Sequence, residues 1–147
     1  MRRNLFKVAL VLTATMLGGG STAASELKPF KSDGCSAFPD GTLKQQDLWL
    51  KCCYAHDLDY WMGGSYGQRK ASDQRLAQCV AQVGQPAIAK AMLAGVRVGG
   101  SPFWPTSFRW GYGWPYFRGY KALTDEELEL VKARLKEKGA AEFHRTN

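Results

Sequence analysis

The chain has 147 residues, and its 20 Lys and Arg outnumber its 13 Asp and Glu, which gives a formal net charge of +7. This length suits one domain of about 100–200 residues, and no stretch after residue 24 is apolar over the roughly 20 residues that a membrane-spanning helix needs. The sequence also contains no helix-turn-helix, zinc-finger or RNA-binding signature. The basic charge therefore favours anionic lipid over nucleic acid as a partner.

The first 24 residues have the pattern of a secretory signal peptide. Arg2, Arg3 and Lys7 precede an apolar run over Val8–Leu17, and small residues follow up to Ala24. This order is typical of a cleaved leader, and the alternative, a membrane anchor, would need a longer apolar stretch. We predict export, to the periplasm or out of the cell, of a single domain over residues 25–147, in which 17 basic and 13 acidic residues leave a formal charge of +4.

Residues 32–42 are rich in Gly, Pro, Ser and Asp and predict a loop without a helix. One interpretation is an ordinary surface turn with Asp40-Gly41 at its tip. The other is a cation-binding loop, because a hard cation such as Ca²⁺ binds about six to eight oxygens from carboxylates, carbonyls and water.

A helix is predicted over Leu48–Met62, with Asp47 as its N-cap and Gly63-Gly64 at its end. Residues four apart share one face of a helix. Three side chains that could carry chemistry have this spacing: Cys52, His56 and Tyr60. Cys53 and Asp57 form a second stripe, turned by about 100°.

A second helix is predicted over Ser65–Val83, with its first residue as the N-cap. If the two helices form an antiparallel hairpin, residues at one level have position numbers with a nearly constant sum. A single register then places Asp73 beside His56 and Cys79 beside Cys52.

All four cysteines lie in the exported part, at positions 35, 52, 53 and 79, and an even number in an exported chain predicts two disulfides. Adjacent helical cysteines point about 100° apart, so Cys52 and Cys53 do not bridge each other. The hairpin register favours Cys52–Cys79, which leaves Cys35–Cys53. A zinc site of Cys52, Cys53, His56 and Asp57 is the rival interpretation, although export and the adjacent cysteines disfavour it.

The pattern Cys52-Cys53-x-x-His56-Asp57-x-x-Tyr60, followed by Asp73 and a cysteine six residues later, is similar to that of the secreted phospholipase A2 family. Asp33-Gly34-Cys35 lies upstream, where the family keeps its calcium loop. The resemblance covers residues 33–79, about a third of the chain. Residues 36–41 depart from the glycine-rich loop of the animal enzymes, so the likeness is to a bacterial-type branch.

The resemblance implies an all-α fold in which two antiparallel, disulfide-linked helices carry the site and a calcium-type loop precedes them. The implied reaction is calcium-dependent hydrolysis of the sn-2 ester of a glycerophospholipid by an activated water. Catalytic roles fall on His56 as general base, on Asp73, which orients it, and on Tyr60, which supports Asp73. The implied calcium ligands are Asp57, Asp33 and the carbonyl of Gly34.

Two further helices are predicted after the resemblance ends. The first is a short apolar helix over Pro86–Val98. The second covers Asp125–Lys138, with Thr124 and Glu127 as a capping box, and residues 140–147 are expected to fray. Its predicted apolar stripe consists of Leu128, Val131 and Leu135.

Residues 102–120 contain nine aromatic side chains, and Gly and Pro interrupt any regular element there. One interpretation is a loop that packs over the helices as additional core. The other is a lipid-binding surface, because Trp and Tyr with Arg and Lys suit the headgroup region of a membrane. The residues predicted for that surface are Trp104, Trp110, Trp114, Arg109 and Arg118.

Two other functions stay open at this stage. A non-catalytic protein of the same fold would bind membrane lipid or a protein partner through the aromatic, basic segment, and the divergent calcium loop favours this alternative. An esterase or acyltransferase that acts on another lipid is the third possibility. The sequence makes no prediction of oligomeric state.

Overall fold

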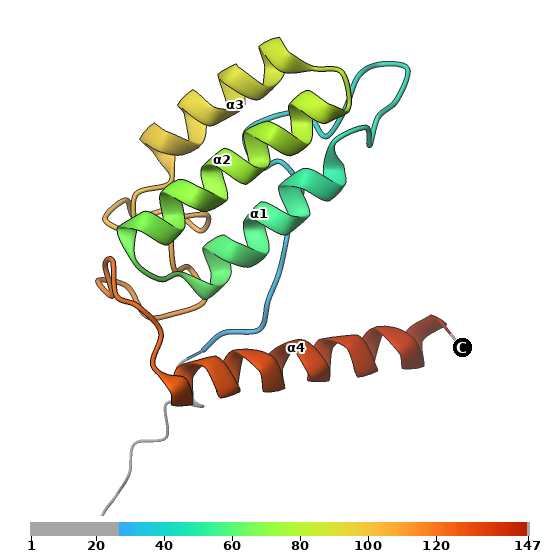
Figure 1. Ribbon diagram of the computed structural model, residues 1–147. Coiled ribbons are helices and arrows are strands. Elements are labelled where there is room, and N and C mark those ends of the chain that lie inside the picture. The colour runs from blue at the N-terminus through green and yellow to red at the C-terminus, as the bar shows by residue number, and fades with distance from the viewer. Residues whose placement is uncertain (1–26, 147) are drawn as a thin grey trace, which may run out of the picture.

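The computed structural model describes residues 27–146, with side chains as far as residue 139. This part of the chain is all α and has four helices and no strand (Figure 1). The helices are α1 (Leu50–Met62), α2 (Tyr66–Gln82), α3 (Pro86–Gly99) and α4 (Asp125–Thr146). Over these residues, no helix combines the length and apolar character needed to cross a membrane. The predicted signal peptide, residues 1–24, lies outside the described residues.

The helices α1 and α2 form the predicted antiparallel hairpin (Figure 1). Gly63 and Gly64 make the turn with φ angles of 71° and 137°, which residues with a Cβ rarely adopt. A Cβ on Gly63 would lie 2.8 Å from the Cα of Gly111, so the turn also needs glycine for close packing. Ser65 then caps α2 in a capping box with Gln68, which satisfies N–H groups at the helix start.

The first helix begins two residues later than predicted, at Leu50, and Trp49 occupies the N-cap position without a side-chain cap. The prediction that Asp47 caps this helix is therefore wrong. The backbone forms turns here instead, and the N–H of Leu50 donates to the carbonyl of Asp47. Trp49 is buried, and its indole N–H donates to the carbonyl of Pro39. Burial of this large side chain fixes the entry into α1 and ties the preceding loop to it.

The second helix lies between α1 and α3 and contacts both (Figure 1). One hydrophobic core fills the space among these three helices. Its buried members are Trp49, Cys52 and Cys53 near the start of α1, Leu76, Ala77 and Val80 on α2, and Ala89 and Met92 on α3. The predicted third helix is confirmed and ends at Gly99 rather than Val98.

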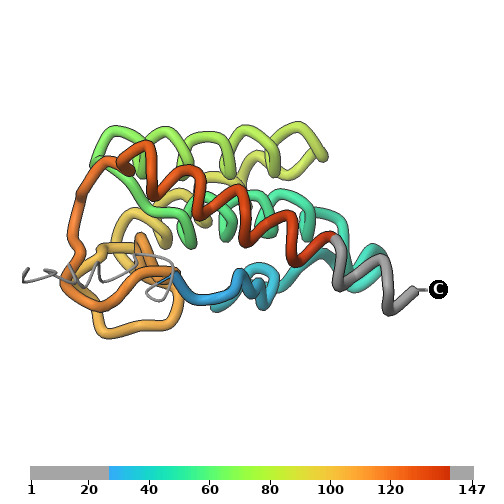
Figure 2. The backbone as a smooth tube through the Cα atoms, turned by 90° about the horizontal axis from the view of Figure 1, so that it is seen from below, coloured from blue at the N-terminus to red at the C-terminus, as the bar shows by residue number. Residues whose placement is uncertain are grey.

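The last helix lies on the other side of α1, with the first described residues between them (Figures 1 and 2). A second core forms there, from Leu27, Phe30, Trp61, Trp114 and Val131. The capping box of Thr124 and Glu127 is present as predicted.

Two details of this helix were predicted wrongly. The helix continues to Thr146 instead of fraying from residue 140, consistent with the high helix propensity of Ala140, Ala141 and Glu142. Leu128 is exposed, and Leu130 packs against the second core together with Leu135.

The aromatic segment, residues 102–120, is an irregular loop that packs against the α1–α2 turn. Trp110 and Trp114 are buried, and their indole N–H groups donate to the carbonyls of Gly64 and Met62. Arg109 is also buried and donates to two backbone carbonyls of the loop itself. The interpretation of this segment as additional core is therefore confirmed for these three side chains.

The same burial contradicts most of the predicted lipid contacts. Trp110, Trp114 and Arg109 face inwards, and Arg118 forms two hydrogen bonds of 2.7 Å to Glu127 while its guanidinium lies over the ring of Trp114. The prediction of a membrane surface is therefore wrong for these four residues, because composition alone does not show which way a side chain points. Only Trp104, at 52% exposure, lies where lipid could reach it.

Candidate active site

His56 on α1 and Asp73 on α2 meet across the hairpin. Nε2 of His56 lies 3.1 Å from Oδ1 of Asp73, and the two side chains are 8% and 0% exposed. Tyr60, one turn after His56, donates its hydroxyl to the same oxygen at 2.7 Å. The predicted register is confirmed, and so is the predicted contact between Tyr60 and Asp73.

The partners of Asp73 fix the direction of its hydrogen bond with His56. An ionised carboxylate only accepts hydrogen bonds, and Asp73 faces the Tyr60 hydroxyl and the guanidinium of Arg97. Burial raises the pKa of Tyr60, and the negative charge of Asp73 raises it further, so the hydroxyl stays protonated. Nε2 of His56 therefore carries the proton and Nδ1 keeps a free lone pair. A histidine held in this form can accept a proton at Nδ1 while the carboxylate stabilises the imidazolium.

Two arginines that the sequence analysis did not single out complete the surroundings of Asp73. Arg69, one turn earlier on α2, has its Nε 4.0 Å from Oδ2 of Asp73 and donates to the Tyr60 hydroxyl at 3.1 Å. Arg97, on α3, has its Nε 2.8 Å from the same Oδ2. The i,i+4 spacing of Arg69 and Asp73 is a readable signal, whereas no local pattern places a residue of α3 beside α2.

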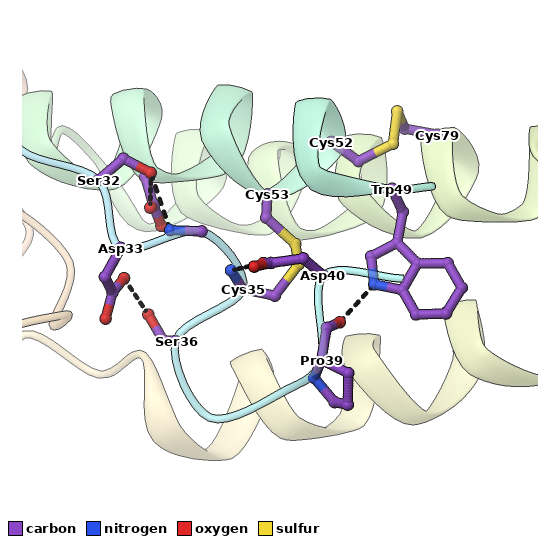
Figure 3. The surroundings of a disulfide bond; sticks show 12 residues. Ser32, Asp33, Cys35, Ser36, Pro39, Asp40, Trp49, Cys52, Cys53 and Cys79 are labelled. Carbon is purple, nitrogen blue, oxygen red and sulfur yellow. Dashed lines mark hydrogen bonds between the residues drawn. A yellow bond between two sulfur atoms is a disulfide. The ribbon is translucent and has the colours of Figure 1, made fainter. Parts of the chain in front are cut away.

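Both predicted disulfides, Cys35–Cys53 and Cys52–Cys79, are present (Figure 3). All four cysteines are bonded, which leaves no thiolate for the alternative zinc site. Cys35–Cys53 ties the loop of residues 32–42 to α1, and Cys52–Cys79 ties α1 to α2 one turn before His56. The loop contains no helix, as predicted.

Side-chain hydrogen bonds order this loop. The carboxylate of Asp40 accepts the N–H of Cys35 at 2.8 Å, and the hydroxyl of Ser36 donates to Asp33 at 2.9 Å (Figure 3). The hydroxyl of Ser32 donates to Oδ2 of Asp57 at 2.6 Å and so connects the loop with α1. Ser32 was not predicted as a site residue.

Asp57 lies in an unfavourable environment for a negative charge. Burial raises the pKa of its carboxyl from 3.8 to about 6, the hydrogen bond from Ser32 lowers it, and the charges of Asp33 and Asp40 raise it. The ion pairs of the described residues include none with Asp57. A bound cation would stabilise the ionised carboxylate of Asp57. Its positive charge would offset both the loss of hydration on burial and the repulsion between these acids.

The residues predicted to bind calcium fit a hard cation through the chemistry of their donors. Asp57 and Asp33 offer carboxylate oxygens, and the loop offers carbonyls where Gly34 and Ser36 turn the backbone with positive φ. No three His, Cys, Asp or Glu side chains gather into a metal cluster anywhere in residues 27–139. Carbonyls and water would therefore supply most ligands, as they can for Ca²⁺.

A cleft of about 310 Å³ opens beside these groups. His56, Asp57 and Tyr60 line it from α1, residues 34–38 of the loop form one wall, and residues of α3 form another. Its apolar lining includes Phe38, Leu76, Met92, Val96 and Phe108. The volume lies within the range of about 300–1,000 Å³ that small-molecule pockets show, and the apolar walls suit a substrate with a hydrocarbon chain.

The aromatic segment, residues 102–120, contributes Phe108 to the lining of the cleft. The same segment also exposes a group of aromatic side chains to solvent. Phe103, Trp104 and Phe117 are 58%, 52% and 77% exposed. The Tyr116 hydroxyl donates to the carbonyl of Phe103 and so joins the two ends of this group. The Trp104 indole donates to the carbonyl of Val98 and so ties the group to α3. We call Phe103, Trp104, Tyr116 and Phe117 the exposed aromatic group.

Comparisons of this chain with protein-family models, with curated proteins and with solved structures found no match.

Proposed function

We propose that this protein is a phospholipase A2-like hydrolase, which uses a water activated by His56 to hydrolyse the sn-2 ester of glycerophospholipids. The observation that carries the proposal is the contact of 3.1 Å between Nε2 of His56 and the buried Asp73. His56 lines an apolar cleft, and a general base must lie at such a position to reach a bound ester.

The proposed chemistry needs no covalent intermediate. Nδ1 of His56 takes a proton from a water molecule as the water oxygen attacks the ester carbonyl, and Asp73 stabilises the imidazolium that forms. The tetrahedral intermediate then collapses, the bond to the glycerol oxygen breaks, and the imidazolium returns its proton to that leaving oxygen. General acid–base help of this kind contributes roughly 10²–10⁴ in rate.

Calcium is the proposed cofactor, and Asp57, Asp33 and the carbonyl of Gly34 are the residues that would hold it. When bound, it would supply positive charge that polarises the ester carbonyl and binds the phosphate. The raised pKa of Asp57, to about 6, supports a cation at this position because burial and neighbouring acids disfavour the bare carboxylate.

A lipid substrate is supported by the apolar lining of the cleft. It is also supported by the exposed aromatic group, which belongs to the segment that contributes Phe108 to this lining. Aromatic side chains favour the membrane–water interface. The formal charge of +4 that we predict for the exported chain favours an anionic membrane surface.

The proposal is tested by measuring fatty-acid release from phospholipid vesicles with calcium and with chelator. We expect release by the wild type in calcium only, and a loss of more than about 100-fold in His56→Gln. His144→Gln, which replaces the other histidine of the chain, is the matched control and should keep full activity. Unchanged release by His56→Gln would rule out the general-base role.

A non-catalytic lipid-binding domain is the alternative that a specific observation favours. Ser32 and Ser36 already hydrogen-bond to Asp57 and Asp33, which are the two proposed carboxylate ligands. In that case calorimetry should show no calcium binding, while the wild type should still sediment with anionic vesicles and release no fatty acid.

A further inference from the structure

The carboxylate of Asp73 is fully buried and takes partners on both oxygens. Oδ1 accepts from the Tyr60 hydroxyl and from His56, both on α1. Oδ2 has no hydrogen bond, and instead faces two guanidinium groups, with Nε of Arg97 at 2.8 Å and Nε of Arg69 at 4.0 Å. The contact with Arg97 is therefore an ion pair whose N–H does not point along the hydrogen-bond direction.

Arg69 is committed to other acceptors. Its Nε donates to the Tyr60 hydroxyl, and its two terminal nitrogens donate to the Tyr120 hydroxyl and to the carbonyls of Val96 and Arg97. Arg69 thus fastens α2 to the end of α3 and to the aromatic segment. Arg97 is the nearer cation to Oδ2, and its own terminal nitrogen donates to the carbonyl of Lys70 on α2.

We propose that Arg97 is a positioning residue for the His56–Asp73 pair, an inference that rests on the proposed function. By holding Oδ2 from α3, Arg97 fixes the plane of the carboxylate so that Oδ1 points to His56 on α1. Without Arg97, Oδ2 would be a buried oxygen with no close partner, and the carboxylate would be free to turn towards Arg69. The orientation of the His56 ring would then be less well defined.

The positive charge of Arg97 also has an opposing effect, because it repels the imidazolium formed during the reaction. Two observations indicate that positioning outweighs repulsion. Arg97 contacts Oδ2, while the imidazole contacts Oδ1, so the carboxylate lies between the two cations. The Arg97 side chain is also 32% exposed, so solvent and salt screen its charge.

Steady-state kinetics on mixed micelles of phospholipid in calcium test the inference. We expect Arg97→Gln to lower kcat by roughly tenfold to a hundredfold, the loss typical of a misplaced catalytic group. KM should stay within about twofold, because Arg97 is not a binding contact in the proposed complex. Arg97→Lys, which keeps the charge, should recover part of the loss. Millimolar guanidinium should partly rescue Arg97→Gly, because the Arg97 side chain is 32% exposed and its removal should open a path from solvent to Asp73.

Arg75→Gln is the matched control. Arg75 pairs with Asp59 at 2.7 Å and links α2 to α1, the two helices that carry Asp73 and His56, without an ion pair to Asp73. The kcat of Arg75→Gln should equal that of the wild type. Circular dichroism checks the fold of each variant, and if Arg97→Gln does not fold, Arg97→Lys and the guanidinium rescue decide the question.

Three results would overturn the inference. A kcat for Arg97→Gln equal to or above the wild-type value would show that the carboxylate needs no help, or that repulsion dominates. An equal loss in Arg75→Gln would show a general effect of helix packing. An inactive wild type would instead refute the proposed function, and the inference with it, and this case is recognised from the wild-type measurement alone.

Discussion

Asp57 illustrates how a site residue can lower the stability of the fold that carries it. Burial and neighbouring acids raise the pKa of its carboxyl from 3.8 to about 6. At about 1.4 kcal/mol per pKa unit this shift corresponds to at most about 3 kcal/mol. Although Asp57 is only 9% exposed, it lines an open cleft that water can enter, so we reduce the expected cost of its charge to roughly 1–2 kcal/mol. Asp57→Asn should therefore raise the free energy of unfolding by this amount at pH 8 without calcium.

The pH dependence of this effect has a definite sign. Because the pKa of Asp57 is higher in the folded protein than in the unfolded chain, the folded protein binds more protons between about pH 4 and pH 6. The contribution of Asp57 to wild-type stability falls as the pH rises through this window. Above the window, the full cost of its buried charge is present. Near pH 4 the folded carboxyl is neutral, so the wild type and Asp57→Asn should have nearly equal stability.

Urea unfolding in chelator, followed by circular dichroism, measures the free energy of unfolding of the wild type and of Asp57→Asn at pH 4 and at pH 8. Asp59→Asn is the matched control, because Asp59 also lies on α1 but pairs with Arg75 at the surface. Loss of that pair should lower stability by at most about 1 kcal/mol. The reasoning is wrong if Asp57→Asn is less stable than the wild type at pH 8, or if the difference between them is the same at both pH values.

Three further predictions concern the surroundings of the site. Tyr60→Phe removes a buried hydroxyl that donates to Asp73 and accepts from Arg69. Urea unfolding should therefore show that the free energy of unfolding falls by about 1.5–3 kcal/mol, and an unchanged midpoint would contradict these contacts. Replacing Cys52 and Cys79 together by Ala removes a bridge between residues 27 apart. The same unfolding measurement should show a loss of roughly 2–4 kcal/mol, and a loss below about 1 kcal/mol would contradict this estimate. Replacing Phe103 and Trp104 together by Ser should weaken sedimentation with anionic vesicles but leave hydrolysis of a short, soluble ester unchanged, and equal sedimentation would exclude this surface from lipid binding.

The sequence predicted the hairpin and its pairs because helix periodicity determines them. Once two helices are joined by a short glycine turn, the spacing of 3.6 residues per turn leaves few registers. The register that places Cys79 at Cys52 also places Asp73 at His56, and the structure contains both contacts. The capping box before α4 was predicted for a similar reason, since Thr124 and Glu127 interact within one helical turn.

Features that depend on distant packing could not be predicted in this way. Asp47 has the chemistry of an N-cap, but burial of Trp49 against the loop moves the start of α1 to Leu50. Trp110 and Trp114 have the composition of a membrane surface, but their indole N–H groups find backbone carbonyls at the α1–α2 turn. Arg97 lies 24 residues from Asp73 on another helix, and no local pattern indicates their ion pair.

The central claim, that His56 activates water for an ester held in the cleft, is tested most directly with a phospholipid that carries different acyl chains at sn-1 and sn-2. Mass spectrometry of the products formed by the wild type in calcium should find the sn-2 fatty acid and the matching lysophospholipid. His56→Gln, folded as judged by circular dichroism, should release less than about a hundredth as much. Release of the sn-1 chain, or equal release by His56→Gln, would contradict the claim.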